Sequence, residues 1–127
     1  MGTSLDDARY FNLATFRKNG SAVETPVWFA PSLGEEPGVY YVFSAGDAGK
    51  VKRLRRDQTA RVAACDVRGK LTGEWRPARA ELIEGADAQT ALTALRRRYG
   101  WQMGLADLLS SLTGRFRRRA YIRVTLT

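Results

Sequence analysis

The sequence predicts a mainly β fold, a small and mostly antiparallel barrel of about six strands with short helices at its periphery. Three observations support this prediction. Asn19-Gly20 is a favoured hairpin turn and separates two segments rich in apolar residues. Residues 39–44, Val-Tyr-Tyr-Val-Phe-Ser, form an apolar run with a glycine close to each end. Residues 120–127 alternate between apolar and polar side chains, as a strand with one buried face does.

The first part of the chain is expected to contain a short helix and three strands. Residues 3–7 offer N-cap side chains for a helix that ends near Tyr10. Strands are expected at 11–16 and 22–30, joined by a two-residue turn at Asn19-Gly20, where both residues tolerate positive φ. Pro26 lacks a backbone N–H, so it suits a sheet edge or a bulge rather than the middle of a ladder. A loop at 31–38 precedes the strand 39–44.

The remainder is expected to contain helices and strands in turn. Val51 and Leu54 place one apolar stripe on a short helix at 49–57, which must dock on the barrel to be stable. Strands follow at 60–67 and 74–83, with a turn at 68–70 between them. Leucines at helical spacing predict helices at 90–99 and from 105 to 114, interrupted by Gly100. In the strand at 120–127, the even-numbered residues share the buried face, and the whole chain, 1–127, fits one domain.

The absence of histidine and the single cysteine exclude several kinds of site. Without histidine the chain has no histidine general base and no Ser-His or Cys-His nucleophile. Cys65 alone forms neither an intrachain disulfide nor a zinc site. We therefore expect no catalytic side chain and no metal ligand, and an enzyme of this composition needs a cofactor for its chemistry. The lone cysteine, and the lack of a long apolar or secretory segment, predict a cytoplasmic protein without membrane contact.

Positive charge is concentrated in one segment. The chain has 21 Lys and Arg against 13 Asp and Glu, and this excess of +8 predicts an anionic partner. Five of the seven residues 50–56 are Lys or Arg. Three explanations are open for them: a nucleic-acid footprint, a clasp for a phosphorylated small molecule, or a solvated helix face. Lys50 begins a helix, where anions bind well, whereas Arg55 and Arg56 are expected to be solvated; no nucleic-acid reader motif lies nearby.

Several motifs support the phosphate explanation when they are taken together. They are residues 10–20 (YFNLATFRKNG), 24–29 (ETPVWF), 41–44 (YVFS), 49–57 (GKVKRLRRD), 61–66 (RVAACD), 72–75 (TGEW) and 99–102 (YGWQ). In these motifs the chain resembles the split-barrel flavin and deazaflavin oxidoreductases related to pyridoxamine 5'-phosphate oxidase, and most closely the branch that uses the deazaflavin coenzyme F420. The resemblance covers nearly the whole chain. It implies an FMN-binding-like split β-barrel and a homodimer with two cofactor sites between the subunits.

The resemblance also assigns residues to the cofactor phosphate. Ser44 would offer a hydroxyl, Lys50 a cation and Gly49 a backbone N–H at the start of the helix. Lys52 and Arg53 would reach the same phosphate or the acidic tail of the deazaflavin. Related oxidases often carry Ser-Arg-Lys where this chain has Ala-Gly-Lys at 48–50, so one phosphate-binding arginine and one hydroxyl are missing.

A second set of residues is assigned to the cofactor ring. The segment Thr25, Pro26, Val27 and Trp28 would run alongside the ring, with backbone groups of Val27 and Trp28 at its polar edge. Trp101 would stack on the ring and Gln102 would hydrogen-bond its edge, although packing and solvent exposure are the simpler explanations for these two side chains.

These expectations lead to one main function. The chain is expected to be an oxidoreductase that transfers a hydride between bound coenzyme F420 and a small organic substrate, as a homodimer without nucleic-acid or membrane partners. FMN is the alternative cofactor. Two further alternatives are a non-catalytic carrier of flavin, F420 or a tetrapyrrole, and a basic nucleic-acid-binding barrel. The lack of histidine argues against axial haem ligation.

Overall fold

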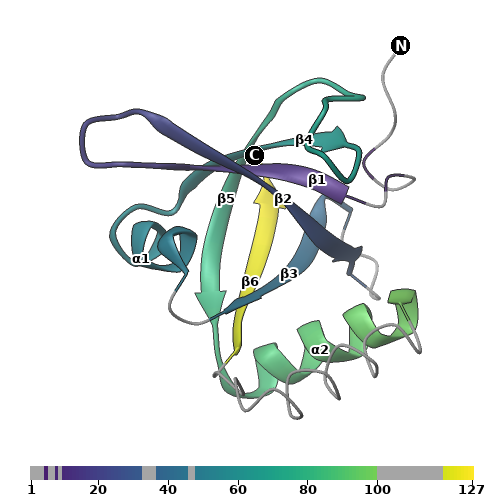
Figure 1. The fold of residues 1–127 in the computed structure, drawn as a ribbon. Coiled ribbons are helices and arrows are strands. Elements are labelled where there is room, and N and C mark those ends of the chain that lie inside the picture. The colour runs from purple at the N-terminus through teal and green to yellow at the C-terminus, as the bar shows by residue number, and fades with distance from the viewer. Residues whose placement is uncertain (1–4, 6–7, 9, 33–36, 46–47, 100–118) are drawn as a thin grey trace, which may run out of the picture.

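The structure is a computed structural model that describes residues 5, 8, 10–32, 37–45, 48–99 and 119–127. Within these residues, six antiparallel strands close into a barrel in the order β1-β2-β3-β6-β5-β4, with β4 pairing back onto β1 (Figure 1). The strands are β1 (Tyr10–Phe16), β2 (Ala22–Pro31), β3 (Val39–Ala45), β4 (Thr59–Cys65), β5 (Arg76–Ile83) and β6 (Arg119–Leu126). The predicted antiparallel barrel with short helices is therefore confirmed.

Alternation along the strands separates an inner and an outer apolar cluster. The inner cluster fills the barrel, where the rings of Phe11 and Phe29 stack with their centroids 4.2 Å apart. The outer cluster lies between the barrel and helix α2 (Gly85–Tyr99), and it includes Tyr41, Ile83 and Leu95. The final strand behaves as predicted, because Ile122 and Val124 are fully buried in the inner cluster.

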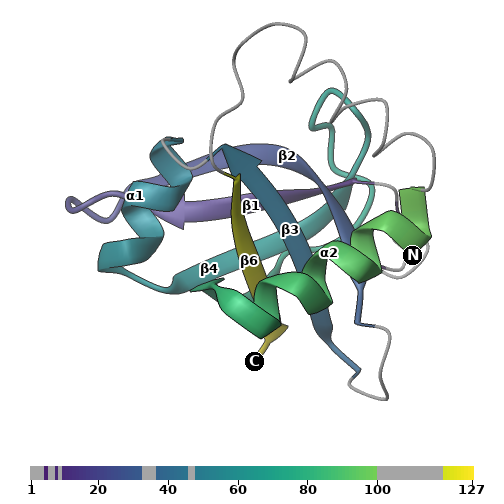
Figure 2. The same ribbon diagram turned by 90° about the horizontal axis from the view of Figure 1, so that it is seen from below.

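The two described helices occupy different places on the barrel. Helix α2 runs across its outer surface and packs on β2, β3 and β6 (Figure 2). Helix α1 (Gly49–Arg56) packs on β1 and β5 beside the β1–β2 hairpin, and the predicted stripe of Val51 and Leu54 is buried. The helices expected near the N-terminus and at 105–114 fall almost entirely outside the described residues.

The turn of the β1–β2 hairpin differs from the two-residue turn that the sequence predicted. The N–H of Gly20 donates to the carbonyl of Arg17, and the N–H of Arg17 donates to the carbonyl of Ser21. Gly20 has φ of 86°, while no described non-glycine residue has positive φ. The loop is thus a three-residue type I turn with a glycine bulge. Asn19 stays out of the left-handed region, and its side chain accepts hydrogen bonds from the Ser21 N–H and hydroxyl.

Strands β2 and β3 are paired over only part of their length. Residues 29–31 of β2 pair with residues 40–42 of β3, whereas residues 22–28 of β2 pair with β1. Hydrogen-bonded and non-hydrogen-bonded pairs alternate along an antiparallel ladder. Arg17 and Ser21 form a hydrogen-bonded pair, so the pair of Asn12 and Pro26, five residues further along each strand, is a non-hydrogen-bonded one. The backbone nitrogen of Pro26 therefore points away from β1, toward β3. Pro26 has no N–H to donate there. The ladder ends before it, as expected of a proline at a sheet edge, and the two strands separate toward α1.

The β4–β5 connection begins earlier than predicted and the strand after it begins later. The carboxylate of Asp66 accepts hydrogen bonds from the N–H groups of Arg68 and Lys70, and this local competition ends β4 at Cys65. The N–H groups of Thr72 and Gly73 then both donate to one carbonyl of β4. The chain is still turning at these residues, so β5 starts at Arg76 instead of at residue 74.

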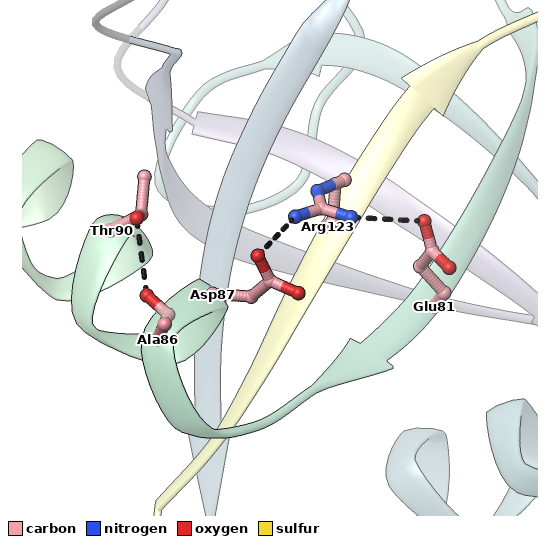
Figure 3. A network of polar contacts seen from close by, with 5 residues as sticks. All are labelled: Glu81, Ala86, Asp87, Thr90 and Arg123. Atoms are coloured by element: carbon pink, nitrogen blue, oxygen red, sulfur yellow. Dashed lines mark hydrogen bonds and ion pairs between the residues drawn. The ribbon is translucent and has the colours of Figure 1, made fainter.

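Helix α2 starts five residues before the predicted boundary. Its first turn, residues 85–88, is mostly exposed and therefore carries no apolar stripe that sequence periodicity detects. Tertiary contacts hold this turn instead. Arg123 of β6 forms ion pairs with Asp87 in the first turn, at 3.2 Å, and with Glu81 of β5, at 3.5 Å (Figure 3). The Tyr41 side chain is hydrogen-bonded to Arg123 and raises its pKa.

Replacing Arg123 with Met tests this network. The change keeps most of the side-chain volume but removes both ion pairs, and we expect the free energy of unfolding to fall by about 1 kcal/mol. Solvent keeps the effect small because the side chains of Asp87 and Glu81 are 61% and 34% exposed. Denaturant unfolding followed by circular dichroism measures the change. Arg79→Met, at an exposed position of β5, is the matched control and should cost less than about 0.5 kcal/mol; equal losses would contradict the role of the network.

Candidate functional site

The cations of α1 divide into two groups according to the side of the helix they occupy. With Val51 and Leu54 buried, helical spacing places Lys50, Arg53 and Arg56 along one flank. This flank faces the end of β1, because Arg53 and Arg56 both donate hydrogen bonds to residues of that strand. We call these three residues the cationic flank. Lys52 and Arg55 lie elsewhere on the helix and are exposed.

Arg53 is held in one orientation by a buried hydroxyl. Its Nε donates a hydrogen bond to Oγ1 of Thr15 at 2.7 Å, and Thr15 is fully buried. The guanidinium lies over the first residue of α1: a Cβ added to Gly49 would be 2.9 Å from Nη1 of Arg53. Any side chain at position 49 would therefore displace the guanidinium from the start of the helix.

The start of α1 carries unbalanced positive charge. Burial and the neighbouring charge of Arg53 lower the pKa of Lys50, and burial and Arg17 lower the pKa of Arg53. In the described part of the chain, no carboxylate lies within ion-pair distance of Lys50, Arg53 or Arg17. Ala48, which precedes the helix, provides no side-chain cap for the first N–H groups. The region is therefore electrostatically suited to an anion.

Ser44 lies at the end of β3, where this strand approaches α1. It is only 7% exposed, and strand alternation places it on the inner face together with Val42. Its partner across the interrupted β2–β3 ladder would be Val27, whose side chain also belongs to the inner cluster. Ser44 is thus near the point where β2 and β3 separate, but its hydroxyl is buried.

The ring-binding segment of β2 is divided between the two faces of the barrel. Val27 points inward, while Trp28 points outward and packs edge-to-face on Phe43 at 6.3 Å between ring centroids. Thr25 is half-buried and Pro26 is exposed. The pairing of Val27 with Phe11 directs the backbone groups of Val27 toward β1, so of Val27 and Trp28 only Trp28 has its backbone on the β3 side.

The remaining predicted residues are not gathered at this site. Lys52 is exposed and lies off the cationic flank, which separates it from Arg53. Trp101 and Gln102 lie outside the described residues. Trp75, the last residue of the motif at 72–75, lies in the β4–β5 connection, and the guanidinium carbon of Arg61 on β4 is 5.3 Å from its ring centroid.

Arg55 and Arg56 line a separate surface hollow of about 710 Å³ at the other end of α1. Both are exposed, as predicted, although Arg56 also donates a hydrogen bond to the carbonyl of Phe16 at 2.6 Å. Their position in the last turn of α1 places positive charge at the negative end of the helix dipole, which is a sufficient structural role for them.

Thr15 is the residue that sequence reasoning missed. It lies on the same strand face as Phe11 and Leu13, which are both fully buried, so a hydroxyl occupies a position where the alternation requires an apolar side chain. A polar residue at an inward position of a strand was the available signal. The partner that uses the hydroxyl, Arg53, is 38 residues away and was not predictable from the pattern.

Cys65 does not contribute a nucleophile. The thiol is 5% exposed, and burial together with the charge of Asp66 raises its pKa to about 11. At neutral pH almost none of it is thiolate, the reactive form. Among the described residues, no three His, Cys, Asp or Glu side chains gather into a possible metal site, and no helix is long and apolar enough to cross a membrane.

The sequence matches no protein-family profile and no curated protein. Among solved structures, the chain is similar to the heme storage protein HutZ from Vibrio cholerae, with a TM-score of 0.69 and 14% identity over 95% of this chain and 83% of HutZ. A conserved hypothetical protein from Mycobacterium tuberculosis has a TM-score of 0.66 and 20% identity over 96% and 75% of the two chains. A candidate pyridoxamine 5'-phosphate oxidase from Listeria innocua has a TM-score of 0.57 and 10% identity over 96% and 86%.

At these identities the likeness concerns the fold. The three similarities extend over 95–96% of this chain, which includes the closed six-stranded barrel. The chain therefore has the split β-barrel fold of the pyridoxamine 5'-phosphate oxidase-like proteins.

Proposed function

We propose that the chain binds a phosphate-bearing flavin-type cofactor, coenzyme F420 with FMN as the alternative, and transfers a hydride between that cofactor and a small organic substrate. One observation carries this proposal. Lys50 is half-buried at the first turn of α1, beside Arg53, and no carboxylate of the described residues pairs with either. The phosphate of the cofactor would supply the missing negative charge.

The electrostatics at Lys50 and Arg53, the members of the cationic flank nearest the start of α1, favour such an anion. A partly buried charge without a counter-ion is unfavourable, and two neighbouring cations add repulsion. An anion at this point would also accept hydrogen bonds from the uncapped N–H groups of the helix. These three contributions act at the same place, which is the end of the barrel where β2 and β3 separate.

The composition supports a division of labour between cofactor and protein. A deazaflavin or flavin supplies the hydride chemistry when it is bound. Side chains of this protein would bind the phosphate, and the separated strands would orient the ring and exclude water. No side chain is assigned a proton-transfer role, because the chain has no histidine and its one thiol is buried with a raised pKa.

The identity of residue 49 bears on the choice of cofactor. Position 49 is a glycine, and the guanidinium of Arg53 lies where a side chain at that position would extend. The phosphate would therefore be bound by Lys50 and Arg53. In related oxidases the lysine at the position of Lys50 is accompanied by an arginine at the position of Gly49 instead. Lys52 is exposed and lies close in sequence, so it remains available to the more acidic deazaflavin. We infer that F420 is bound in preference to FMN.

A non-catalytic carrier is the second candidate. The fold similarity to a heme storage protein supports it, because that protein is named for retention of a ligand. The absence of histidine removes the commonest axial ligand for haem, so a carrier with this sequence would hold a flavin or deazaflavin. Turnover of unsaturated acceptors by the reduced complex distinguishes an enzyme from a carrier.

Replacing Lys50 with Ala tests the phosphate clasp. Loss of a charge-assisted hydrogen bond costs roughly 1.5–3 kcal/mol, so we expect cofactor affinity to fall about ten- to hundredfold. Fluorescence titration of the cofactor measures this. The matched control replaces Arg55 and Arg56 with Ala and should change affinity less than about threefold. A nucleic-acid-binding barrel predicts the opposite order, with the double variant losing most retention on a polyanion.

A side-by-side titration with F420 and FMN tests the choice of cofactor. We expect F420 to bind more tightly, because Lys50 and Arg53 would serve the phosphate of either cofactor, whereas the exposed Lys52 adds charge for the acidic tail that only F420 carries. The purified apo-protein is titrated with each cofactor at the same ionic strength, since charge contacts weaken with salt. Tighter binding of FMN by about tenfold, equivalent to 1.4 kcal/mol, would make FMN the cofactor.

We also infer a homodimer, with the cofactor between two copies of the chain. Half-buried aromatic side chains such as Trp28 and Phe43 are suited to an interface core. Light scattering at micromolar concentration, with and without cofactor, should give the mass of two chains of 14.2 kDa. A stable monomer under both conditions would exclude a cofactor site shared between subunits.

A further inference from the structure

The proposed function assigns Arg53 to the cofactor phosphate but gives no role to Thr15, the hydrogen-bond partner of Arg53. Lys52 and Arg53 were equivalent candidates in the sequence, but the structure separates them: Lys52 is exposed, and Arg53 is anchored by Nε to the buried Oγ1 of Thr15 at 2.7 Å. A hydrogen bond at Nε leaves N–H groups of both Nη atoms able to donate to another acceptor. One of them, Nη1, lies against Gly49 at the start of α1.

We propose that Thr15 is a positioning residue, and that it fixes the Arg53 guanidinium over Gly49 so that Arg53 and Lys50 bind the cofactor phosphate together. This inference rests on the proposed function. In this proposal the second cation that binds the phosphate is Arg53, one helical turn after Lys50. The proposal also explains why position 49 is glycine, because a side chain there would collide with the Arg53 guanidinium. Arg53 supplies from position 53 the guanidinium that a side chain at position 49 would otherwise carry.

In the described part of the chain, the Thr15 hydroxyl accepts a hydrogen bond from the side chain of Arg53. A buried hydroxyl that only filled space would be replaced without loss by an apolar side chain, and its neighbours on this strand face, Phe11 and Leu13, are apolar. Thr15 instead accepts a hydrogen bond from a cation whose neighbours are other cations, Lys50 and Arg17. The bond therefore holds Arg53 close to charges that repel it. Such an arrangement is useful when an anion binds between them.

Substitutions at Gly49 separate binding from stability. In Gly49→Ala, the new Cβ would lie 2.9 Å from Nη1 of Arg53, so the flexible guanidinium must move away from the start of the helix. Alanine favours the helix more than glycine does. We expect the melting temperature to stay the same or rise while affinity for the phosphate-bearing cofactor falls by about three- to tenfold. A merely structural role of this region predicts that the two quantities change together.

A double-mutant cycle tests the coupling of Thr15 to Arg53. Thr15→Val removes the acceptor at nearly constant volume, and Thr15→Ser retains it. We expect about a three- to tenfold loss of affinity for Val and less than about twofold for Ser. In the Arg53→Ala background, Thr15→Val should have no further effect on affinity, because its role acts through Arg53. Arg55→Ala, at an exposed cation of the same helix outside the proposed site, is the matched control and should change affinity less than about threefold.

The probes are FMN and riboflavin, which differ by the phosphate, each titrated by fluorescence with every variant. The losses should appear with FMN and not with riboflavin. If Thr15→Val weakens both equally, or remains harmful in the Arg53→Ala background, the positioning role is wrong. If Arg53→Ala binds FMN normally while Lys50→Ala does not, this inference fails and the proposed function stands. If Lys50→Ala also binds FMN and F420 normally, the proposed function itself fails.

Discussion

Closure of the barrel by the β4–β1 ladder is the constraint on which the rest of the structure depends. In a closed antiparallel barrel every strand residue faces either the interior or the outer surface, because side chains alternate along each strand and the ladders around the barrel fix the register. The inner cluster and the outer cluster under α2 follow from this alternation. So does the position of Thr15, whose hydroxyl must lie inside the barrel and therefore meets α1 rather than solvent.

The candidate site exists where this regular pairing stops. Pro26 cannot donate a hydrogen bond toward β3, so the β2–β3 ladder ends and the strands separate on the side of α1. The helix that follows β3 brings Lys50 and Arg53 to this opening, and its buried stripe of Val51 and Leu54 determines which side of the helix faces the barrel. Local backbone chemistry and helix packing together thus concentrate positive charge at one end of the barrel.

The five cations of residues 50–56 have different environments, and only the packed helix distinguishes them. Lys50 and Arg53 share the side that faces β1, without carboxylate partners in the described structure. Arg55 and Arg56 lie at the opposite helix end beside an open hollow. A uniform basic segment in the sequence therefore becomes a partly buried pair, proposed to hold a phosphate, and three exposed cations, Lys52, Arg55 and Arg56, that solvent screens.

The sequence by itself determined the approximate places of the six strands along the chain, the antiparallel barrel and the buried stripe of α1, because period-2 and helical patterns reflect which face of an element is buried. It did not determine the order of the strands around the barrel, which depends on pairing between distant segments. It did not determine the boundaries held by tertiary contacts, such as the start of α2 at the Arg123 ion pairs. Nor did it determine the hairpin turn, where the strand register required a three-residue loop although Asn19-Gly20 permits a two-residue one. The pairing of Thr15 with Arg53 depended entirely on the tertiary structure, since contacts between distant segments arise from packing and leave no local periodicity.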